Sequence, residues 1–408
     1  MSHANAPRRV LLHVGTPKTG TSYVQDVLFR NRDMLRKAGI LYPAHRFDAH
    51  FLAALDLMQL PWGGLEAQAH GLWDRTAEQA KEWPGTAIIS HEILATASRG
   101  QVARALSSLG HPETEVHVVL SVRDLVRQIP AEWQENIKHR SGFSYGDFLA
   151  KIQDPARQGR VANWFWGVQE IPDILDRWAE DLPPERVHLV TVPAPGGPPD
   201  VLWGRFCEAF GISGLDLDRD GERTNPSLGV PETALVRRIN VKANRDVPPA
   251  RYRPLVRELL AHRTLSRRTG SPRLTLPPDL HPWAKELAAA WIEEVKSRGY
   301  HVVGDLSDLV GPDPTEPYVD PDRPEEAEVA DAAVDAVKAL LLENGRLLGV
   351  EEQLNAQLEE TRQELQRSYL RPSYLARERI VRKLQSSRTG RGMLRVYRFG
   401  RGRSSRSA

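Results

Sequence analysis

Short apolar runs alternate with helix-period segments through the first three hundred residues of the chain. The runs at residues 9–14, 87–90, 116–122 and 187–192, with a shorter one at 40–42, are continuous and bounded by polar turns. Such runs are typical of parallel strands that are buried on both faces. Helical patterns separate them, and residues 231–298 are almost wholly helical by pattern. The alternation predicts an α/β fold, a parallel sheet flanked by helices with a C-terminal helical extension. The glycine-rich loop described below makes this sheet P-loop-like.

Composition changes after this region and divides the chain into four parts. Residues 1–310 form the α/β domain, and a segment rich in proline and acids at 311–326 predicts an extended linker. Residues 327–370 predict an amphipathic helix, followed by a basic tail at 371–408. One heptad register places apolar residues at a and d positions, with three polar interruptions: Val337, Leu340, Leu347, Leu354, Leu358 and Leu365, against Asn344, Glu351 and Thr361. The helix is therefore expected either to self-associate as a coiled coil or to pack back on the body.

Charge is distributed unevenly along the chain. The net charge is +2, but the tail from Arg371 to Ala408 carries +11, which leaves −9 on the remainder. This tail is a candidate contact for anionic surfaces, including membrane lipid, and it contains no recognisable nucleic-acid-binding module. Cys207 is the single cysteine, which excludes an internal disulfide and favours a reducing compartment. No apolar run approaches a membrane span, so we expect a cytoplasmic protein, with peripheral membrane contact through the tail left open.

A glycine-rich loop follows the first predicted strand. Its residues are Gly15, Thr16, Pro17, Lys18, Thr19, Gly20, Thr21 and Ser22. The two glycines have the spacing of a phosphate-binding loop, and a predicted helix begins at about Thr21. Backbone N–H groups and the positive end of that helix can converge there on an anion. We call residues 15–22 the phosphate loop.

The phosphate loop differs from that of a nucleoside triphosphatase. Those enzymes place lysine directly after the second glycine, whereas Thr21 stands there in this chain and the cation is Lys18, inside the loop. Thr21 and Ser22 can still donate hydroxyl hydrogen bonds to phosphate oxygens. The pattern indicates a site for one phosphate and a neighbouring anionic group within reach of Lys18.

The run from Pro17 to Ser22 resembles the 5′-phosphosulfate loop of sulfotransferases, and its flanking residues look like the bacterial branch of that superfamily. The resemblance covers about residues 8–300. It implies transfer of a sulfuryl group from 3′-phosphoadenosine 5′-phosphosulfate (PAPS) to a hydroxyl or amine of an unidentified acceptor, which is a small molecule, a glycan or a lipid. It also implies no obligatory metal. Lys18 would then stabilise charge on the oxygen that leaves sulfur.

The resemblance implies a second anchor for the donor. In the family an arginine at the end of a later strand and a serine eight residues on hold the 3′-phosphate. Arg123 matches the arginine and ends the apolar run at 116–122, but Ala131 stands where the serine is expected. Arg127, Gln134 and Lys138 on the following helix are candidate substitutes.

Sulfuryl transfer requires a base for the acceptor proton. His91 and Glu92 directly follow the predicted strand at 87–90, where the family places its catalytic His or Glu. Glu92 is the first choice, although burial would have to raise the pKa of its carboxyl for efficient catalysis. His91 is the alternative because its ordinary pKa is better suited to neutral pH.

Two other functions are compatible with the sequence. One is a Mg²⁺-dependent nucleotide kinase with Asp124 as metal ligand, and the other is a catalytically silent scaffold or binding protein.

Three further segments carry weaker signals. The aromatic segment at 163–167 lines the acceptor pocket or belongs to the core. His50 is a candidate acceptor contact or a capping residue. The stretch at 223–229 resembles a bacterial sulfotransferase segment that either closes over the nucleotide or turns into the helical region.

Overall fold

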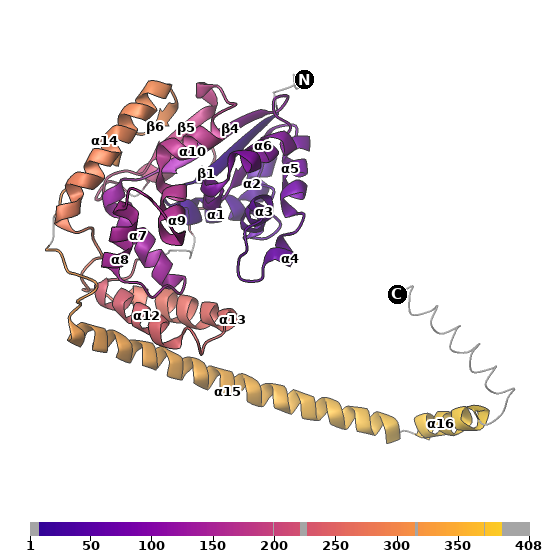
Figure 1. Ribbon diagram of the computed structural model, residues 1–408. Coiled ribbons are helices and arrows are strands. Elements are labelled where there is room, and N and C mark those ends of the chain that lie inside the picture. Colours follow the sequence, from indigo (N-terminus) through magenta and orange to yellow (C-terminus); the bar gives the residue numbers. More distant parts are fainter. Residues whose placement is uncertain (1–7, 199, 221–226, 315–316, 371, 386–408) are drawn as a thin grey trace. The chain divides into compact units, whose positions relative to one another are not determined.

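The computed structural model describes residues 8–385 except 199, 221–226, 315–316 and 371. Within them, six parallel strands form one sheet in the order β2-β3-β1-β4-β5-β6 (Figure 1). The strands are β1 (Arg9–Gly15), β2 (Ile40–Leu41), β3 (Thr86–Ser90), β4 (Glu115–Val122), β5 (Val187–Thr191) and β6 (His301–Val303). The α/β class and the parallel sheet flanked by helices are confirmed. The strand β6 was not predicted, because its three residues carry too short an apolar signal.

Helices connect and cover the strands. Those that follow the first three strands are α1 (Thr21–Arg30), α2 (Arg32–Lys37), α3 (Ala49–Met58), α4 (Glu66–Ala69), α5 (Leu72–Glu82), the 3₁₀ turn η1 (Glu92–Thr96) and α6 (Arg99–Ser108). After β4 come α7 (Leu125–Lys138), α8 (Tyr145–Gln153), α9 (Arg160–Gln169) and α10 (Ile171–Trp178), and after β5 comes α11 (Val201–Phe210). The helix predicted to begin at about Thr21 ends at Arg30, and α2 follows it after Asn31.

The region after α11 is helical but interrupted. It contains α12 (Val230–Ala243), α13 (Pro249–Tyr252), the π-helical η3 (Arg253–Thr264) and α14 (His281–Arg298). Residues 268–277 between η3 and α14 contain no helix, so the expectation of an almost wholly helical segment at 231–298 holds only in part. Figure 1 shows α14 beside β6 and the pair α12 and α13 together at a distance from the sheet.

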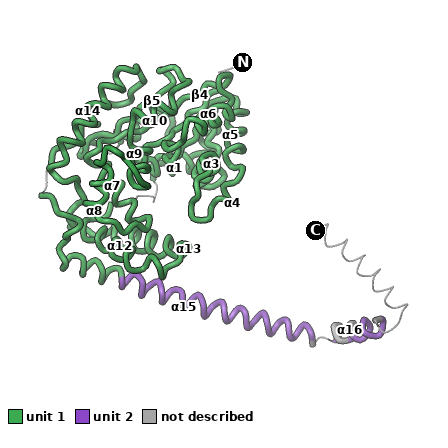
Figure 2. The backbone as a smooth tube through the Cα atoms, in the orientation of Figure 1, with its two compact units in different colours: residues 1–336 green, residues 337–408 purple. Residues whose placement is uncertain are grey.

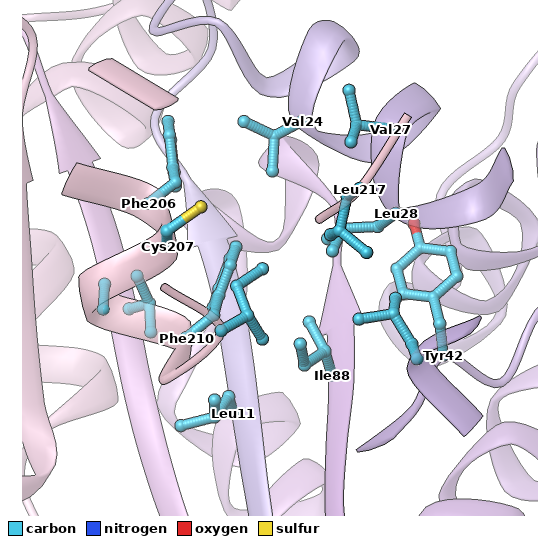
Figure 3. Packing of buried hydrophobic residues seen from close by; sticks show 14 of the residues in the cluster. Leu11, Val24, Val27, Leu28, Tyr42, Ile88, Phe206, Cys207, Phe210 and Leu217 are labelled. Atoms are coloured by element: carbon cyan, nitrogen blue, oxygen red, sulfur yellow. The ribbon is translucent and has the colours of Figure 1, made fainter. Parts of the chain in front are cut away.

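The sheet is buried on both faces, as its continuous apolar strands require. On one face, Leu11 of β1 and Ile88 of β3 pack with Val24 and Leu28 of α1 and with aromatic residues of α11 (Figure 3). On the other face, Leu12 has no exposed surface. Burial of this kind contributes about 1.5–3 kcal/mol for each large apolar side chain.

Cys207 belongs to the first of these two faces and is buried there. Burial raises the pKa of its thiol to about 11, so the thiolate is scarce at neutral pH. Cys207 is therefore a structural residue of the core.

The C-terminal helices divide between two compact units, residues 1–336 and residues 337–408 (Figure 2). α15 (Glu326–Leu370) begins in the first unit, where Val329, Ala332 and Ala336 are buried. In the second unit its leucines lie open: Leu347 is 47% and Leu354 59% exposed. α16 (Pro372–Gln385) follows α15. Residues 386–408 of the basic tail lie outside the described residues.

The proline-rich segment before α15 is non-helical in its described parts, 311–314 and 317–325. It is anchored to the body rather than free, because the Asp322 carboxylate accepts the backbone N–H groups of Tyr145 at 3.0 Å and Gly146 at 2.8 Å, at the start of α8. In the part of the chain that is described, no helix is long and apolar enough to cross a membrane.

Candidate functional site

Three neighbouring strands end at one edge of the sheet and bring the predicted site residues together. β1 lies between β3 and β4, and all three run in the same direction. The phosphate loop follows β1, His91 and Glu92 follow β3, and Arg123 follows β4. This edge, outside the carboxyl ends of parallel strands, is where open α/β sheets bind ligands.

The phosphate loop begins against the residues that follow β3. Gly15 has a φ of +140°, and a Cβ atom there would stand 3.0 Å from the backbone oxygen of Glu92. Gly20 ends the loop with a left-handed φ of +89°, and a Cβ atom there would stand 2.9 Å from Leu202 Cδ2 of α11. Glycine is required at position 15 by conformation and by the nearby backbone, and at position 20 by its φ, since the Leu202 side chain can shift.

Ser121 of β4 holds the loop in shape. Its carbonyl accepts the Thr16 N–H at 2.7 Å, and its hydroxyl donates to the Gly15 carbonyl at 2.9 Å. The Thr19 hydroxyl lies 2.6 Å from the Ser121 hydroxyl. This serine was missed in the sequence, where the one available signal was a small polar residue inside an otherwise apolar strand.

His13 supports the same contacts from beneath. Its Nε2 lies 3.0 Å from Ser121 Oγ and its Nδ1 lies 2.8 Å from Ser90 Oγ, so it bridges β4 and β3. Burial lowers the pKa of His13 to about 4, which keeps the ring neutral at physiological pH. His13 is therefore a structural brace for the loop and carries no charge toward a ligand.

Lys18 is oriented by an acidic partner on α7. Its Nζ lies 2.5 Å from Glu135 Oε2, and the other carboxylate oxygen lies 3.2 Å from Arg257 Nη2 and 3.0 Å from His139 Nε2. Burial alone would raise the pKa of Glu135, but Lys18 and His139 outweigh it and hold the pKa well below its usual range. The carboxylate is therefore charged, and its three partners leave this group of side chains net positive when His139 is protonated and also when it is neutral.

A chain of buried amides links the phosphate loop to a second acid. The Gln128 amide donates to the Pro17 carbonyl at 2.5 Å and to Gln169 Oε1 at 2.9 Å. The Gln169 amide in turn donates to Glu132 Oε1 at 3.1 Å. Glu132 is 3% exposed, and burial raises its pKa to about 7. No motif or periodicity in the sequence singles out this carboxyl.

His91 and Glu92 are partly exposed and lie close to each other. His91 Nδ1 accepts the Ile93 N–H at 3.3 Å, so in the neutral ring the proton is on Nε2, 4.0 Å from Glu92 Oε2. That tautomer makes His91 a donor and leaves Glu92 as the acceptor of protons. The Glu92 carboxylate also accepts the Gln25 amide at 2.9 Å.

The pKa values of this pair do not follow the expectation for Glu92. Burial would raise the pKa of its carboxyl, but His91, a backbone hydrogen bond and Gln25 together lower it below the usual value. Burial also lowers the pKa of His91. At neutral pH the pair therefore consists of an ionised carboxylate and a neutral imidazole.

Arg123 does not form an ion pair with the neighbouring Asp124, which pairs with Arg127 instead. Its Nη2 donates to the Arg127 carbonyl at 3.1 Å, while its Nε is buried without a partner among the described residues. Burial, with the nearby Arg127, lowers its pKa to about 10, and the group remains charged at neutral pH. A buried guanidinium N–H without a partner suits an anion that approaches from the sheet edge.

The residues proposed to bind the 3′-phosphate in place of the missing serine have surroundings of other kinds. Arg127 pairs with Asp124, Nε to Oδ2 at 2.5 Å, and donates to the Pro193 carbonyl. Gln134 exchanges hydrogen bonds with the backbone of Leu228 at 2.9 and 3.0 Å. Lys138 is 3% exposed, and burial lowers its pKa to about 8. Arg127 and Gln134 are thus structural.

The three segments with weaker sequence signals differ in their surroundings. In the aromatic segment, Phe165 and Trp166 are buried core residues, whereas Trp164 is partly exposed and lies 6.1 Å from Trp62 between ring centroids. His50 is buried, and its Nδ1 accepts the Ser90 N–H at 3.2 Å, which makes it a structural residue. Of the stretch at 223–229, residues 223–226 lie outside the described residues.

No protein-family model, no curated protein and no solved structure matches this chain. Among the described residues, no group of three or more His, Cys, Asp or Glu side chains is arranged to hold a metal ion. The account of function therefore depends on the geometry of the sheet edge and on the chemistry of its residues.

Proposed function

We propose that this chain is a sulfotransferase, which moves a sulfuryl group from PAPS to a hydroxyl or amine of an acceptor. The observation that carries the proposal is that two cationic groups follow the carboxyl ends of two adjacent parallel strands, β1 and β4. Lys18 lies inside the loop before α1, and Arg123, with its unpartnered buried Nε, lies at the end of the adjacent strand. Two separate anion sites suit the 5′-phosphosulfate and the 3′-phosphate of the donor.

The residues support a direct in-line transfer. The Glu92 carboxylate takes the proton from the acceptor hydroxyl or amine as that oxygen or nitrogen attacks sulfur. The bond between sulfur and the bridging phosphate oxygen breaks, and adenosine 3′,5′-bisphosphate leaves with the electron pair. Lys18, at the phosphate loop, stabilises the charge that develops on this oxygen. His91 is the alternative base if its tautomer reverses.

The kinase alternative is weakened by the position of Asp124. This carboxylate is 1% exposed, accepts the Arg127 N–H at 2.9 Å as the cap of α7, and pairs with the Arg127 guanidinium. A metal ligand would have to give up these bonds. The silent-scaffold alternative rests on Ala131, since the structure supplies no hydroxyl at that position.

Calorimetry separates the three functions. The full-length protein is titrated with adenosine 3′,5′-bisphosphate and, separately, with ATP and Mg²⁺. We expect binding of the bisphosphate and weaker or no binding of ATP with Mg²⁺. Tight ATP binding without bisphosphate binding would rule out the sulfotransferase and favour the kinase, and no binding of either would favour the scaffold.

A further inference from the structure

A continuous row of aromatic rings lies beside the candidate base. The ring centroids of His91 and Phe51 are 5.1 Å apart, and those of Phe51 and Trp62 are 5.8 Å apart. Trp62 continues to His139 and to Trp164, each with a centroid separation of 6.1 Å. None of the five side chains is buried. We call Phe51, Trp62 and Trp164 the aromatic wall.

The first end of the aromatic wall lies at the start of the phosphate loop. Phe51 contacts His91, and the next residue, Glu92, places its backbone oxygen 3.0 Å from where a Cβ atom on Gly15 would stand. The candidate base and the first loop residue are therefore beside this end.

The middle ring of the wall is linked to the cation of the same loop. His139, which contacts Trp62, lies 3.0 Å from Glu135 Oε1, and the other oxygen of that carboxylate binds Lys18 at 2.5 Å. Contacts thus connect the wall to two parts of the phosphate loop, through His91 and Glu92 at Phe51 and through His139 and Glu135 at Trp62.

The chain assembles this wall from segments far apart in the sequence. Phe51 belongs to α3, Trp62 to the segment between α3 and α4, and Trp164 to α9. Contiguous apolar rings with exposed surface beside polar groups are typical of ligand-binding surfaces. Among the aromatic residues of its segment only Trp164 is partly exposed, since Phe165 and Trp166 are buried in the core.

We propose that the aromatic wall binds the acceptor, and that the acceptor is a pyranoside, a proposal that rests on the sulfotransferase function proposed above. A pyranose ring has an apolar C–H face that packs on a flat aromatic ring and hydroxyl groups around its edge. His91 beside Phe51 and His139 beside Trp62 supply polar partners for such hydroxyls. A phenol or an acyl chain is better served by enclosure of its whole apolar surface, whereas these partly exposed rings cover one face.

Saturation-transfer NMR on the full-length protein, saturated with adenosine 3′,5′-bisphosphate, tests this assignment. The probes are the methyl glycosides of glucose, galactose, mannose and N-acetylglucosamine, with phenol and 1-hexanol for comparison. We expect transfer to the ring C–H protons of at least one glycoside. Trp62→Ala and Trp164→Ala should each weaken this binding by about fivefold or more, and Trp62→Phe should restore part of it.

Trp83→Ala is the matched control, because Trp83 is also partly exposed but contacts Gly39 and Arg36 rather than the wall. Bisphosphate affinity shows that each variant is folded. The proposal is overturned if no glycoside receives saturation, if the wall variants bind glycosides as wild type does, or if phenol or hexanol is the probe whose binding they remove. If wild type does not bind the bisphosphate, the proposed sulfotransferase function is contradicted instead. The same NMR titration without nucleotide then tests glycoside binding by the wall alone.

Discussion

The ammonium group of Lys18 lies 2.5 Å from the Glu135 carboxylate, so the one cation inside the phosphate loop is held by an acid on α7. The pair is partly buried, with 20% and 18% of the two side chains exposed. A carboxylate in this position competes with any anion that the loop binds.

Glu135→Gln should strengthen binding of adenosine 3′,5′-bisphosphate. The substitution removes the competing charge and leaves Lys18 and Arg257 to face the ligand, so we expect about threefold to tenfold tighter binding, or roughly 0.7–1.4 kcal/mol. Calorimetry at low and high salt measures the change, which added salt should reduce. Glu180→Gln, which alters an exposed pair with Arg99, is the control. Weaker binding in Glu135→Gln would show that the acid positions Lys18 rather than competing for it.

The fold was predictable because its main signals are local. Continuous apolar runs identify β1, β3, β4 and β5, and the spacing of Gly15 and Gly20 identifies the loop between β1 and α1. Which strands lie side by side was harder to predict, because strand pairing depends on packing between segments that are distant in the sequence. β6 pairs with β5 through three residues, which is too few for a sequence pattern to register.

The candidate site was predictable where function follows a strand end, and not where it depends on contacts between distant residues. Lys18, Glu92 and Arg123 could be named because each stands directly after a strand or within its loop. Glu135 and Ser121 could not, because their roles come from contacts with residues 117 and 106 positions away. No periodicity or motif records such contacts.

Glu132 should make stability depend on pH. Burial raises its pKa from 4.5 to about 7, so folding favours the protonated carboxyl. This stabilisation is fully present below pH 4.5 and is lost as pH rises through 7, a loss of a few kcal/mol. Relative to Glu132→Gln, wild type should therefore lose free energy of unfolding over this range in urea titrations. The exposed substitution Glu208→Gln should leave the wild-type profile unchanged, and parallel profiles for wild type and Glu132→Gln would contradict the assignment.

Glu92→Gln should lower turnover by about 10²-fold, the lower end of the usual contribution of a general base, because a lowered pKa makes the Glu92 carboxylate a weaker base. Because the pKa of Glu92 is lowered, wild-type turnover should be level across neutral pH and fall only in acid. Release of adenosine 3′,5′-bisphosphate from PAPS, with the mixed methyl glycosides as acceptors, is the measurement. His91→Asn should reduce turnover less. A larger loss of turnover in His91→Asn than in Glu92→Gln would show that His91 is the base.

The exposed leucines of α15 should mediate self-association. Leu347 and Leu354 occupy d positions of the heptad register and are about half exposed, an arrangement that a second copy of the helix would bury. Sedimentation velocity should show a dimer or larger for wild type and a 45.8 kDa monomer for the double variant Leu347→Asp/Leu354→Asp. Leu342→Asp is the control, because Leu342 is exposed but lies outside the a and d positions. A monomeric wild type would contradict self-association.

The central claim is that Lys18 serves the 5′ end of the donor and Arg123 its 3′-phosphate. Calorimetric affinities of adenosine 3′,5′-bisphosphate and of adenosine 5′-monophosphate, measured for wild type, Lys18→Ala and Arg123→Ala, test it most directly. We predict that wild type binds the bisphosphate more tightly than the monophosphate and that Arg123→Ala removes this preference. Lys18→Ala should weaken binding of both nucleotides and retain the preference for the bisphosphate. Equal affinity of wild type for the two nucleotides, or an Arg123→Ala variant that retains the preference, would contradict the account.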